Sequence, residues 1–182
     1  MNSTNKYDAD GNGIYFFTAT IHSWLPLLDS RGNKEMVVAY LKELSERALI
    51  RVYAFVIMPN HVHIIWEQVN KNGKETAQGS FLKYTAHRLL KKLKETGDSG
   101  PYEVYAANKK HEIWQPDSLS IEIYSRAVAK QKLDYLHFNP VSGKWRLAAD
   151  DLSYYYSSAR FYETGIDEFG FLHDLYSVFD GE

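Results

Sequence analysis

Two short apolar runs on either side of a turn signal constrain the fold of this chain more than any other feature. Residues 49–58 are almost continuously apolar, and residues 61–67 form a second run directly after Pro59-Asn60. Runs of this length that are rich in Val, Ile and aromatic residues are typical of buried strands. A Pro-Asn pair favours a turn. The sequence therefore predicts a β-hairpin whose two strands are buried in a sheet.

The flanking segments predict the rest of the fold. Three stretches carry apolar residues at helical spacing: 34–48, 80–95 and 124–138, the last ending before Pro140. Further strands are predicted at 14–21, around Val104 and at 113–114. The first six elements follow the split βαβ order of an α+β, ferredoxin-like fold. We expect an antiparallel sheet with two helices on one face and the helix at 124–138, which carries a candidate tyrosine, on the other.

Length and charge predict a single domain. The chain has 182 residues, 45% of them hydrophobic, and no cysteine, which excludes disulfides, thiolate metal sites and cysteine nucleophiles. All 21 Lys and Arg residues lie within residues 1–160, whereas the segment after Arg160 is acidic. We expect one domain over 1–182, with a core at about 14–163 and an acidic tail at 164–182. This tail either shields a basic surface or is simply solvated.

Targeting signals are not visible in the sequence. Residues 2–13 are polar and rich in glycine, unlike a secretory signal. No run approaches the roughly 18 apolar residues of a membrane-spanning helix. We expect a cytoplasmic protein that does not engage a membrane.

Two histidines interrupt the second apolar run. On a strand, His61 and His63 point to one face, while Val62, Ile64 and Trp66 point to the other. Two imidazoles on one face can bind a single divalent cation, which could act as a Lewis acid on a phosphoryl oxygen. The alternative is a pair of partly exposed histidines that form hydrogen bonds with their neighbours.

The helix at 124–138 supplies a second candidate pair. Tyr135 and Asn139 are four residues apart and therefore share a helical face. Pro140 disfavours helical backbone at Asn139, so the helix should end there. The amide oxygen could complete a metal shell, and the phenol could attack an electrophile held by the same metal. The alternative is that Tyr135 is an ordinary core or surface residue, as most of the 14 tyrosines must be.

These motifs together resemble the single-tyrosine HUH transposases, and more closely their REP-associated tyrosine transposase branch. The resemblance rests on Met-Pro-Asn-His-Val-His at 58–63 and Tyr-Leu-His-Phe-Asn-Pro-Val at 135–141, and it extends over about 14–163. It implies that His61 and His63 are the metal ligands, that Asn139 replaces a polar residue that is often glutamine, and that Tyr135 is the nucleophile. The segment after Trp114 departs from the usual pattern.

The resemblance also implies an activity and a partner. The chain would be a metal-dependent endonuclease and strand transferase for single-stranded DNA, using Mg²⁺ or Mn²⁺ and a 5′-phosphotyrosine intermediate. Its substrate would be hairpin-containing DNA, and the protein would be a monomer or a homodimer. Two alternatives remain: a catalytically idle nucleic-acid-binding module with the same fold, and a metal-dependent hydrolase whose nucleophile is water.

Basic and aromatic residues mark candidate DNA contacts, because single strands bind to basic grooves with aromatic platforms. Each basic residue also has the alternative interpretation that it lies on the solvated face of a helix. The candidates are Lys83, His87, Arg88, Lys91, Lys92, Lys109, Lys110, Trp114, Lys130 and Lys132.

Overall fold

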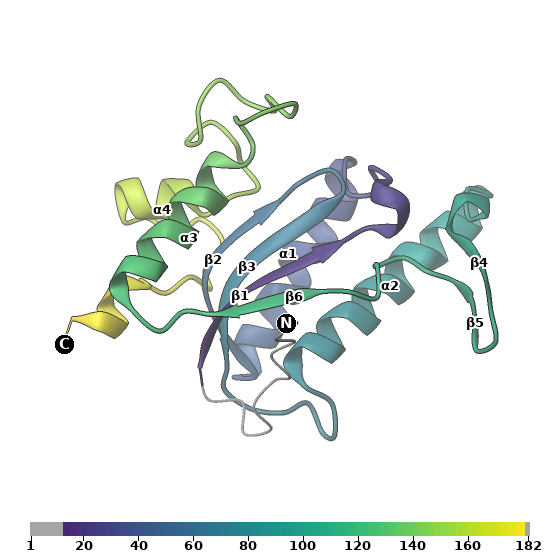
Figure 1. The fold of residues 1–182 in the computed structure, drawn as a ribbon, viewed down its shortest axis with the longest axis horizontal. Helices are drawn as coiled ribbons and strands as arrows, with labels where there is room; N and C mark the ends of the chain where they lie inside the picture. The colour runs from purple at the N-terminus through teal and green to yellow at the C-terminus, as the bar shows by residue number, and fades with distance from the viewer. Residues whose placement is uncertain (1–12, 181–182) are drawn as a thin grey trace, which may run out of the picture.

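A four-stranded antiparallel sheet forms the centre of the computed structural model, which describes residues 13–180 (Figure 1). Its strands are β1 (Ile14–Thr20), β2 (Ile50–Ile57), β3 (His61–Gln68) and β6 (Leu119–Glu122). They lie in the order β2-β3-β1-β6, and each neighbouring pair is antiparallel. The antiparallel sheet expected from the sequence is therefore present.

The β2–β3 hairpin forms where the two apolar runs predicted it. The turn at 58–60 is closed by a 2.8 Å hydrogen bond from the Met58 backbone N–H to the His61 carbonyl. The pairing register shifts between Val52 and Ala54, which leaves an extra residue, Tyr53, in β2. Such a bulge bends a strand locally.

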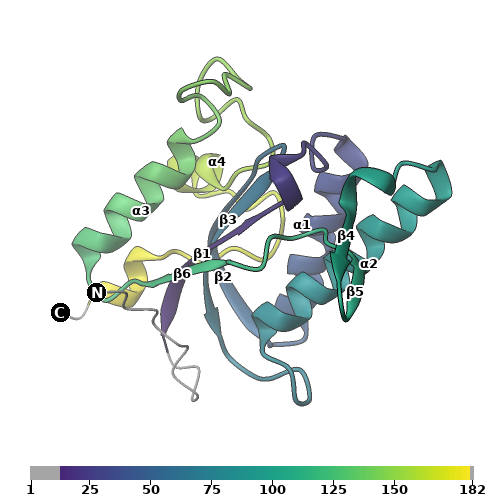
Figure 2. The same cartoon turned by 45° about the vertical axis from the view of Figure 1, so that its right-hand side comes forward.

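Helices cover both faces of the sheet (Figure 2). Helices α1 (Arg31–Glu46) and α2 (Ala77–Thr96) pack on one face, and α3 (Arg126–Phe138) packs on the other. Each of these three helices begins after a Ser or Thr whose side chain accepts a hydrogen bond from the backbone N–H three residues later. These N-caps explain why α1 and α2 start about a turn earlier than apolar spacing predicted.

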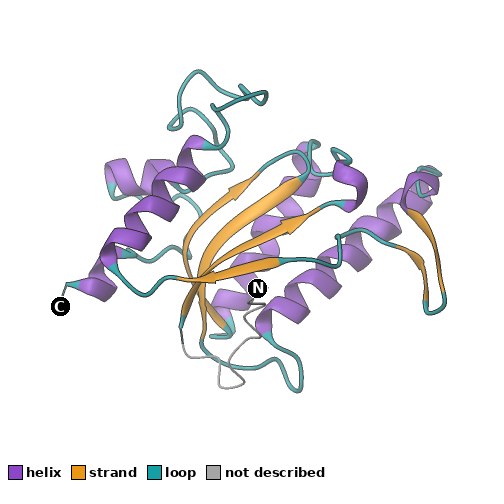
Figure 3. Cartoon of the chain, in the orientation of Figure 1, coloured by secondary structure: helices purple, strands orange, loops and turns teal. Residues whose placement is uncertain are grey.

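The fourth strand differs from the prediction. It is β6, whereas Trp114 makes only an isolated bridge to Ile21. The segment around Val104 forms a separate hairpin of β4 (Glu103–Ala106) and β5 (Lys109–His111). The hairpin follows the short turn η2 (Gly100–Tyr102) at the C-terminal end of α2 and is separate from the central sheet (Figure 3). Strand β6 is a short, partly exposed edge strand, and its four residues alternate apolar and polar without the continuous apolar run of a buried strand.

The described part of the predicted acidic tail packs into the body of the protein. Beyond α4 (Ala159–Thr164), Leu172 pairs with Val52 at the edge of the sheet, and Phe171 is buried in the core under α1 and α2. The short turn η3 (Tyr176–Phe179) packs against α3. None of the helices in the described part of the chain is long and apolar enough to cross a membrane.

The Leu175→Ala variant is expected to lose about 2–5 kcal/mol of unfolding free energy, because Leu175 is fully buried and truncation leaves a cavity. Urea denaturation monitored by circular dichroism measures the loss. Val178→Ala is the matched control, since its side chain is 47% exposed and its loss should change stability by less than about 0.5 kcal/mol. Equal midpoints for the two variants would contradict the packing described here.

Candidate active site

His61 and His63 lie side by side on β3, on the sheet face that α3 covers. Both are buried, and their ring centroids are 4.8 Å apart. His61 Nδ1 is 2.7 Å from Asn60 Oδ1, and His63 Nδ1 is 2.8 Å from Thr18 Oγ1. Because each Nδ1 has a hydrogen-bonding partner, each Nε2 is the ring nitrogen that could offer its lone pair to a metal.

Burial keeps both imidazoles neutral. Desolvation lowers the pKa of His61 to about 4, helped by the charge of Lys144 and opposed by a hydrogen bond with Asn139. Desolvation also lowers the pKa of His63 to about 3, reinforced by His61 and Lys132. Only a neutral imidazole has a lone pair available to bind a cation. Both residues are therefore in the ligating form at neutral pH.

Helix α3 brings Asn139 and Tyr135 to the histidines. The Asn139 side chain is buried, and its Nδ2 lies 3.3 Å from His63 Nε2. The Tyr135 ring is 54% exposed and packs edge-on against His63, with ring centroids 5.3 Å apart, and against Phe16. The shared helical face predicted for Tyr135 and Asn139 is therefore present beside the histidine pair.

The end of α3 differs in detail from the expectation. Asn139 keeps helical backbone angles, with φ −54° and ψ −45°, although it precedes Pro140. The backbone N–H groups of Val141 and Ser142 both bond to the Phe138 carbonyl, so the chain makes one more turn after the helix. This turn pairs the Phe138 carbonyl, one of the last carbonyls of α3, and it holds Asn139 one turn beyond Tyr135.

A cavity of about 560 Å³ contains these four side chains. Strands β1 and β6 contribute an apolar and hydroxyl wall, and Lys132 and Lys144 supply positive charge. None of the described residues that line the cavity carries a carboxylate. The lining consists of Phe16, Thr18, Thr20, Trp24, His61, His63, Leu119, Ile121, Lys132, Tyr135, Asn139, Ser142, Gly143, Lys144 and Trp145. The cavity is thus locally basic in a chain whose formal net charge is −2.

The donors that face this cavity could hold a divalent cation. Residues 13–180 contain no group of three or more His, Cys, Asp or Glu side chains arranged to hold a metal. The donor set is instead two neutral imidazoles and one carboxamide, His61, His63 and Asn139. Half a turn of the Asn139 amide would exchange its nitrogen for its oxygen beside His63. Two nitrogens and one oxygen would then leave open positions for water or phosphate oxygens.

Two residues that orient the histidines were missed by the sequence reasoning. Thr18 is paired with His63 across β1 and β3, and Asn60 precedes His61 in the hairpin turn. The alternation of Phe16, Thr18 and Thr20 along β1 was the available signal, because it places two hydroxyls on one strand face. Which neighbour Thr18 faces depends on the register of a long-range strand pair.

The predicted DNA contacts fall in three places. Those on α2 are exposed, but they lie on the opposite side of the sheet from Tyr135. Three of them have polar partners: Lys83 contacts Glu75, Lys91 contacts Glu95, and Lys92 contacts Asn33. Lys109 and Lys110 are on the β4–β5 hairpin, where Lys109 pairs with Glu112. On α3, Lys130 pairs with Asp134, whereas Lys132 lines the cavity.

Trp114 is a correction to the predicted DNA contacts. Its indole is 7% exposed and donates a 2.9 Å hydrogen bond to Thr85 Oγ1 on α2. It also packs against Phe81 in the core. A ring buried in this way is not accessible to a nucleobase. It contributes instead to the packing of α2.

His137 is buried outside the cavity and should make stability depend on pH. Its Nε2 is 2.8 Å from Ser158 Oγ, and burial lowers its pKa to about 4. Between pH 6.5 and 4 the unfolded chain binds a proton that the folded chain excludes, so stability falls as pH falls. We expect this residue to lower the free energy of unfolding by about 2 kcal/mol between pH 7.5 and pH 5.

Urea unfolding at the two pH values measures this cost. His137→Gln should show a correspondingly smaller loss of stability between them, whatever its stability at pH 7.5. An identical pH dependence in wild type and variant would contradict the predicted role of His137.

Comparison with known proteins identifies a similar fold but gives no match to a family model or to a curated sequence. The solved structure of a REP-associated tyrosine transposase bound to a REP hairpin is similar, with 19% identity, a TM-score of 0.61, and coverage of 96% of this chain and 93% of that one. A candidate transposase from Deinococcus radiodurans R1 matches at 13% identity and a TM-score of 0.46, over 74% of this chain and 95% of that one. The chain therefore has a fold similar to that of a tyrosine transposase.

Proposed function

We propose that this protein is a metal-dependent endonuclease and strand transferase for single-stranded DNA, with Tyr135 as nucleophile. The observation that carries the proposal is the half-exposed Tyr135 ring beside His63 and Asn139 in a basic, carboxylate-free cavity. A phenol in that place can reach a phosphodiester held at the same donors. The surrounding charge favours a phosphate over a neutral substrate.

Each residue would have a distinct role in cleavage. The Tyr135 oxygen attacks phosphorus, the bond to the 3′-oxygen breaks, and a 5′-phosphotyrosine forms. The phenol loses its proton, and the departing 3′-oxygen gains one. Lys132 and Lys144 stabilise the negative phosphate, while Asn60 and Thr18 keep the imidazoles in one orientation. The reverse attack by another 3′-OH rejoins strands, so no nucleotide cofactor is required.

His61, His63 and Asn139 would hold the divalent cation. When bound, the metal supplies Lewis-acid polarisation of the phosphoryl group. Because two of the three protein donors are imidazoles, Mn²⁺ should bind more tightly than Mg²⁺.

The fold supports the same proposal. A four-stranded antiparallel sheet with α1 and α2 on one face and α3 on the other is consistent with a transposase-like fold. The similar solved structure is of a REP-associated tyrosine transposase bound to a REP hairpin. We therefore propose hairpin-containing single-stranded DNA as the substrate class.

The test is a search for the covalent intermediate. The full chain is incubated with Mn²⁺ and a panel of 3′-labelled oligonucleotides, each with a hairpin beside a single-stranded flank of varied sequence. A labelled band that migrates with the protein under denaturing conditions is the expected result. Cleavage to a free 5′-phosphate without any adduct would favour a hydrolase that uses water. Binding without cleavage across the panel would favour an idle binding module.

A further inference from the structure

Trp24 has an unusual conformation at the edge of the candidate active site. It lies in the short turn η1 (His22–Trp24) after β1, and its indole is 58% exposed. Ser23 and Trp24 have φ values of 52° and 58°, so two consecutive residues with side chains adopt left-handed backbone. A bulky residue rarely adopts this region, and it persists only where the surroundings enforce it.

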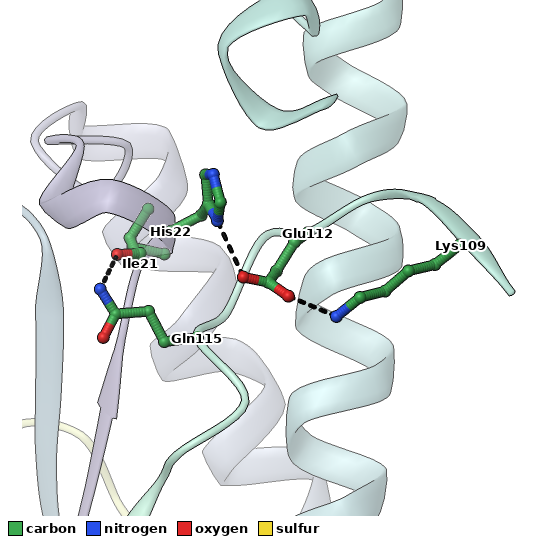
Figure 4. Close-up of polar contacts among 5 residues, drawn as sticks. All are labelled: Ile21, His22, Lys109, Glu112 and Gln115. Carbon is green, nitrogen blue, oxygen red and sulfur yellow. Dashed lines mark hydrogen bonds and ion pairs between the residues drawn. The ribbon is translucent and has the colours of Figure 1, made fainter. Parts of the chain in front are cut away.

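Hydrogen bonds from three segments enforce the turn. The Trp24 N–H donates to the Ile21 carbonyl at 2.9 Å, and Asn60 Nδ2 donates to the Trp24 carbonyl at 3.0 Å. Figure 4 shows the other side, where His22 Nδ1 lies 2.8 Å from Glu112 Oε1 and Gln115 donates to the Ile21 carbonyl. The backbone of Trp24 is therefore held in a fixed place, so its exposed side chain projects from a fixed point at the edge of the cavity.

That place is next to His61. The centroids of the Trp24 and His61 rings are 6.4 Å apart, at an interplanar angle of 69°. The same Asn60 carboxamide that holds the Trp24 backbone also accepts the 2.7 Å hydrogen bond from His61 Nδ1. One side chain thus contacts both the ring of His61 and the backbone of Trp24. Tyr135 lies beside the other histidine, so the histidine pair separates the indole from the phenol.

The surroundings of the indole suit one class of occupant. Trp24 lines the cavity together with apolar Leu119 and Ile121 on β6 and with Trp145, whose ring centroid is 5.9 Å from that of His61. Lys132 and Lys144 line the same cavity, and none of its described lining residues carries a carboxylate. Aromatic surface for stacking beside positive charge for phosphates is the chemistry of a single-stranded nucleic-acid site.

We propose that Trp24 is the stacking platform for one nucleobase of the bound single strand, the base that adjoins the phosphodiester at Tyr135. The inference rests on the proposed function for its occupant, single-stranded DNA. Stacking on a fixed indole would set the register of the strand, so that one particular phosphodiester lies at the phenol. Trp24 would be a positioning residue with no part in the chemical step.

Binding is measured in a Tyr135→Phe background, so that cleavage does not disturb the equilibrium. The probes are a labelled hairpin oligonucleotide and a series with one abasic site at each position of its single-stranded flank. Trp24→Gly should weaken binding of the intact strand by about tenfold to hundredfold. One abasic position should weaken binding to the parent protein similarly, and the two losses should not add.

Two variants and one stability measurement separate stacking from misfolding. Glycine adopts φ near +58° without strain, so Trp24→Gly should unfold at the same or a higher urea concentration than the parent. Trp24→Phe should keep most of the affinity. Tyr124→Ala is the matched control, because its ring is 72% exposed but lies beyond the end of β6 that is remote from His61 and His63. It should bind as the parent does.

Unchanged affinity in Trp24→Gly, or losses that add at every abasic position, would overturn the stacking platform. These outcomes are distinguishable from failure of the proposed function. An adduct without non-additive losses refutes the platform alone, whereas non-additive losses without an adduct refute the nuclease and leave the platform in place.

Discussion

Tyr135→Phe is expected to abolish covalent cleavage of single-stranded DNA while leaving the folded protein and its DNA affinity intact. The substitution removes one oxygen from a ring that is 54% exposed, and the edge contacts of that ring with His63 and Phe16 remain possible. Because the missing oxygen is the proposed nucleophile, the rate should fall by about 10³-fold or more. A gel assay with 3′-labelled oligonucleotide measures both strand cleavage and the protein adduct.

Tyr124→Phe is the control for this experiment. It removes the phenolic oxygen from another exposed tyrosine, and the variant should form the adduct at the wild-type rate. An adduct at wild-type level in Tyr135→Phe would move the nucleophile to another tyrosine. Retained cleavage with no adduct in either protein would indicate water as the nucleophile.

Replacing both histidines with alanine should remove the proposed metal site and, with it, the proposed cleavage. Loss of a residue that only orients a metal ligand typically weakens metal binding by about 10–100-fold, so the loss of two ligands should exceed this range. Titration calorimetry with Mn²⁺ gives the affinity of wild type and of the His61→Ala/His63→Ala variant. Unchanged affinity would place the metal elsewhere.

His137→Gln is a suitable control for the metal measurement. His137 is buried like the two candidate ligands, but it contacts Ser158 and does not line the cavity. Its replacement should leave Mn²⁺ affinity within about twofold of wild type. A comparable loss of affinity in this variant would indicate that the alanine result reports general destabilisation of the fold.

The sequence predicted the parts of the site that depend on local periodicity. Alternation along β3 put His61 and His63 on one face, and helical spacing put Tyr135 and Asn139 together. The structure bears out both placements. Thr18 and Trp24 required knowledge of strand register and of a strained turn. Neither follows from a residue's immediate neighbours, because both depend on segments about 40 residues apart in the sequence.

Total charge was a poor guide to the candidate site. The chain has a formal net charge of −2, yet the cavity holds two lysines and no described carboxylate. Many acidic residues are instead paired on outer surfaces, such as Glu75 with Lys83 and Asp134 with Lys130. Local charge within a Debye length decides attraction to phosphate, and composition does not report it.

The pairing of Leu172 with Val52 affects how the chain folds. Contacts between residues so far apart must close a long loop before they contribute any stability, which slows folding. The core beneath α3 also needs Leu175 and Phe179, near the end of the described residues. During synthesis on the ribosome, we expect the sheet to lack this support until those residues have emerged. A nascent chain would therefore carry the two histidines and the tyrosine before the packing that supports the candidate site is complete.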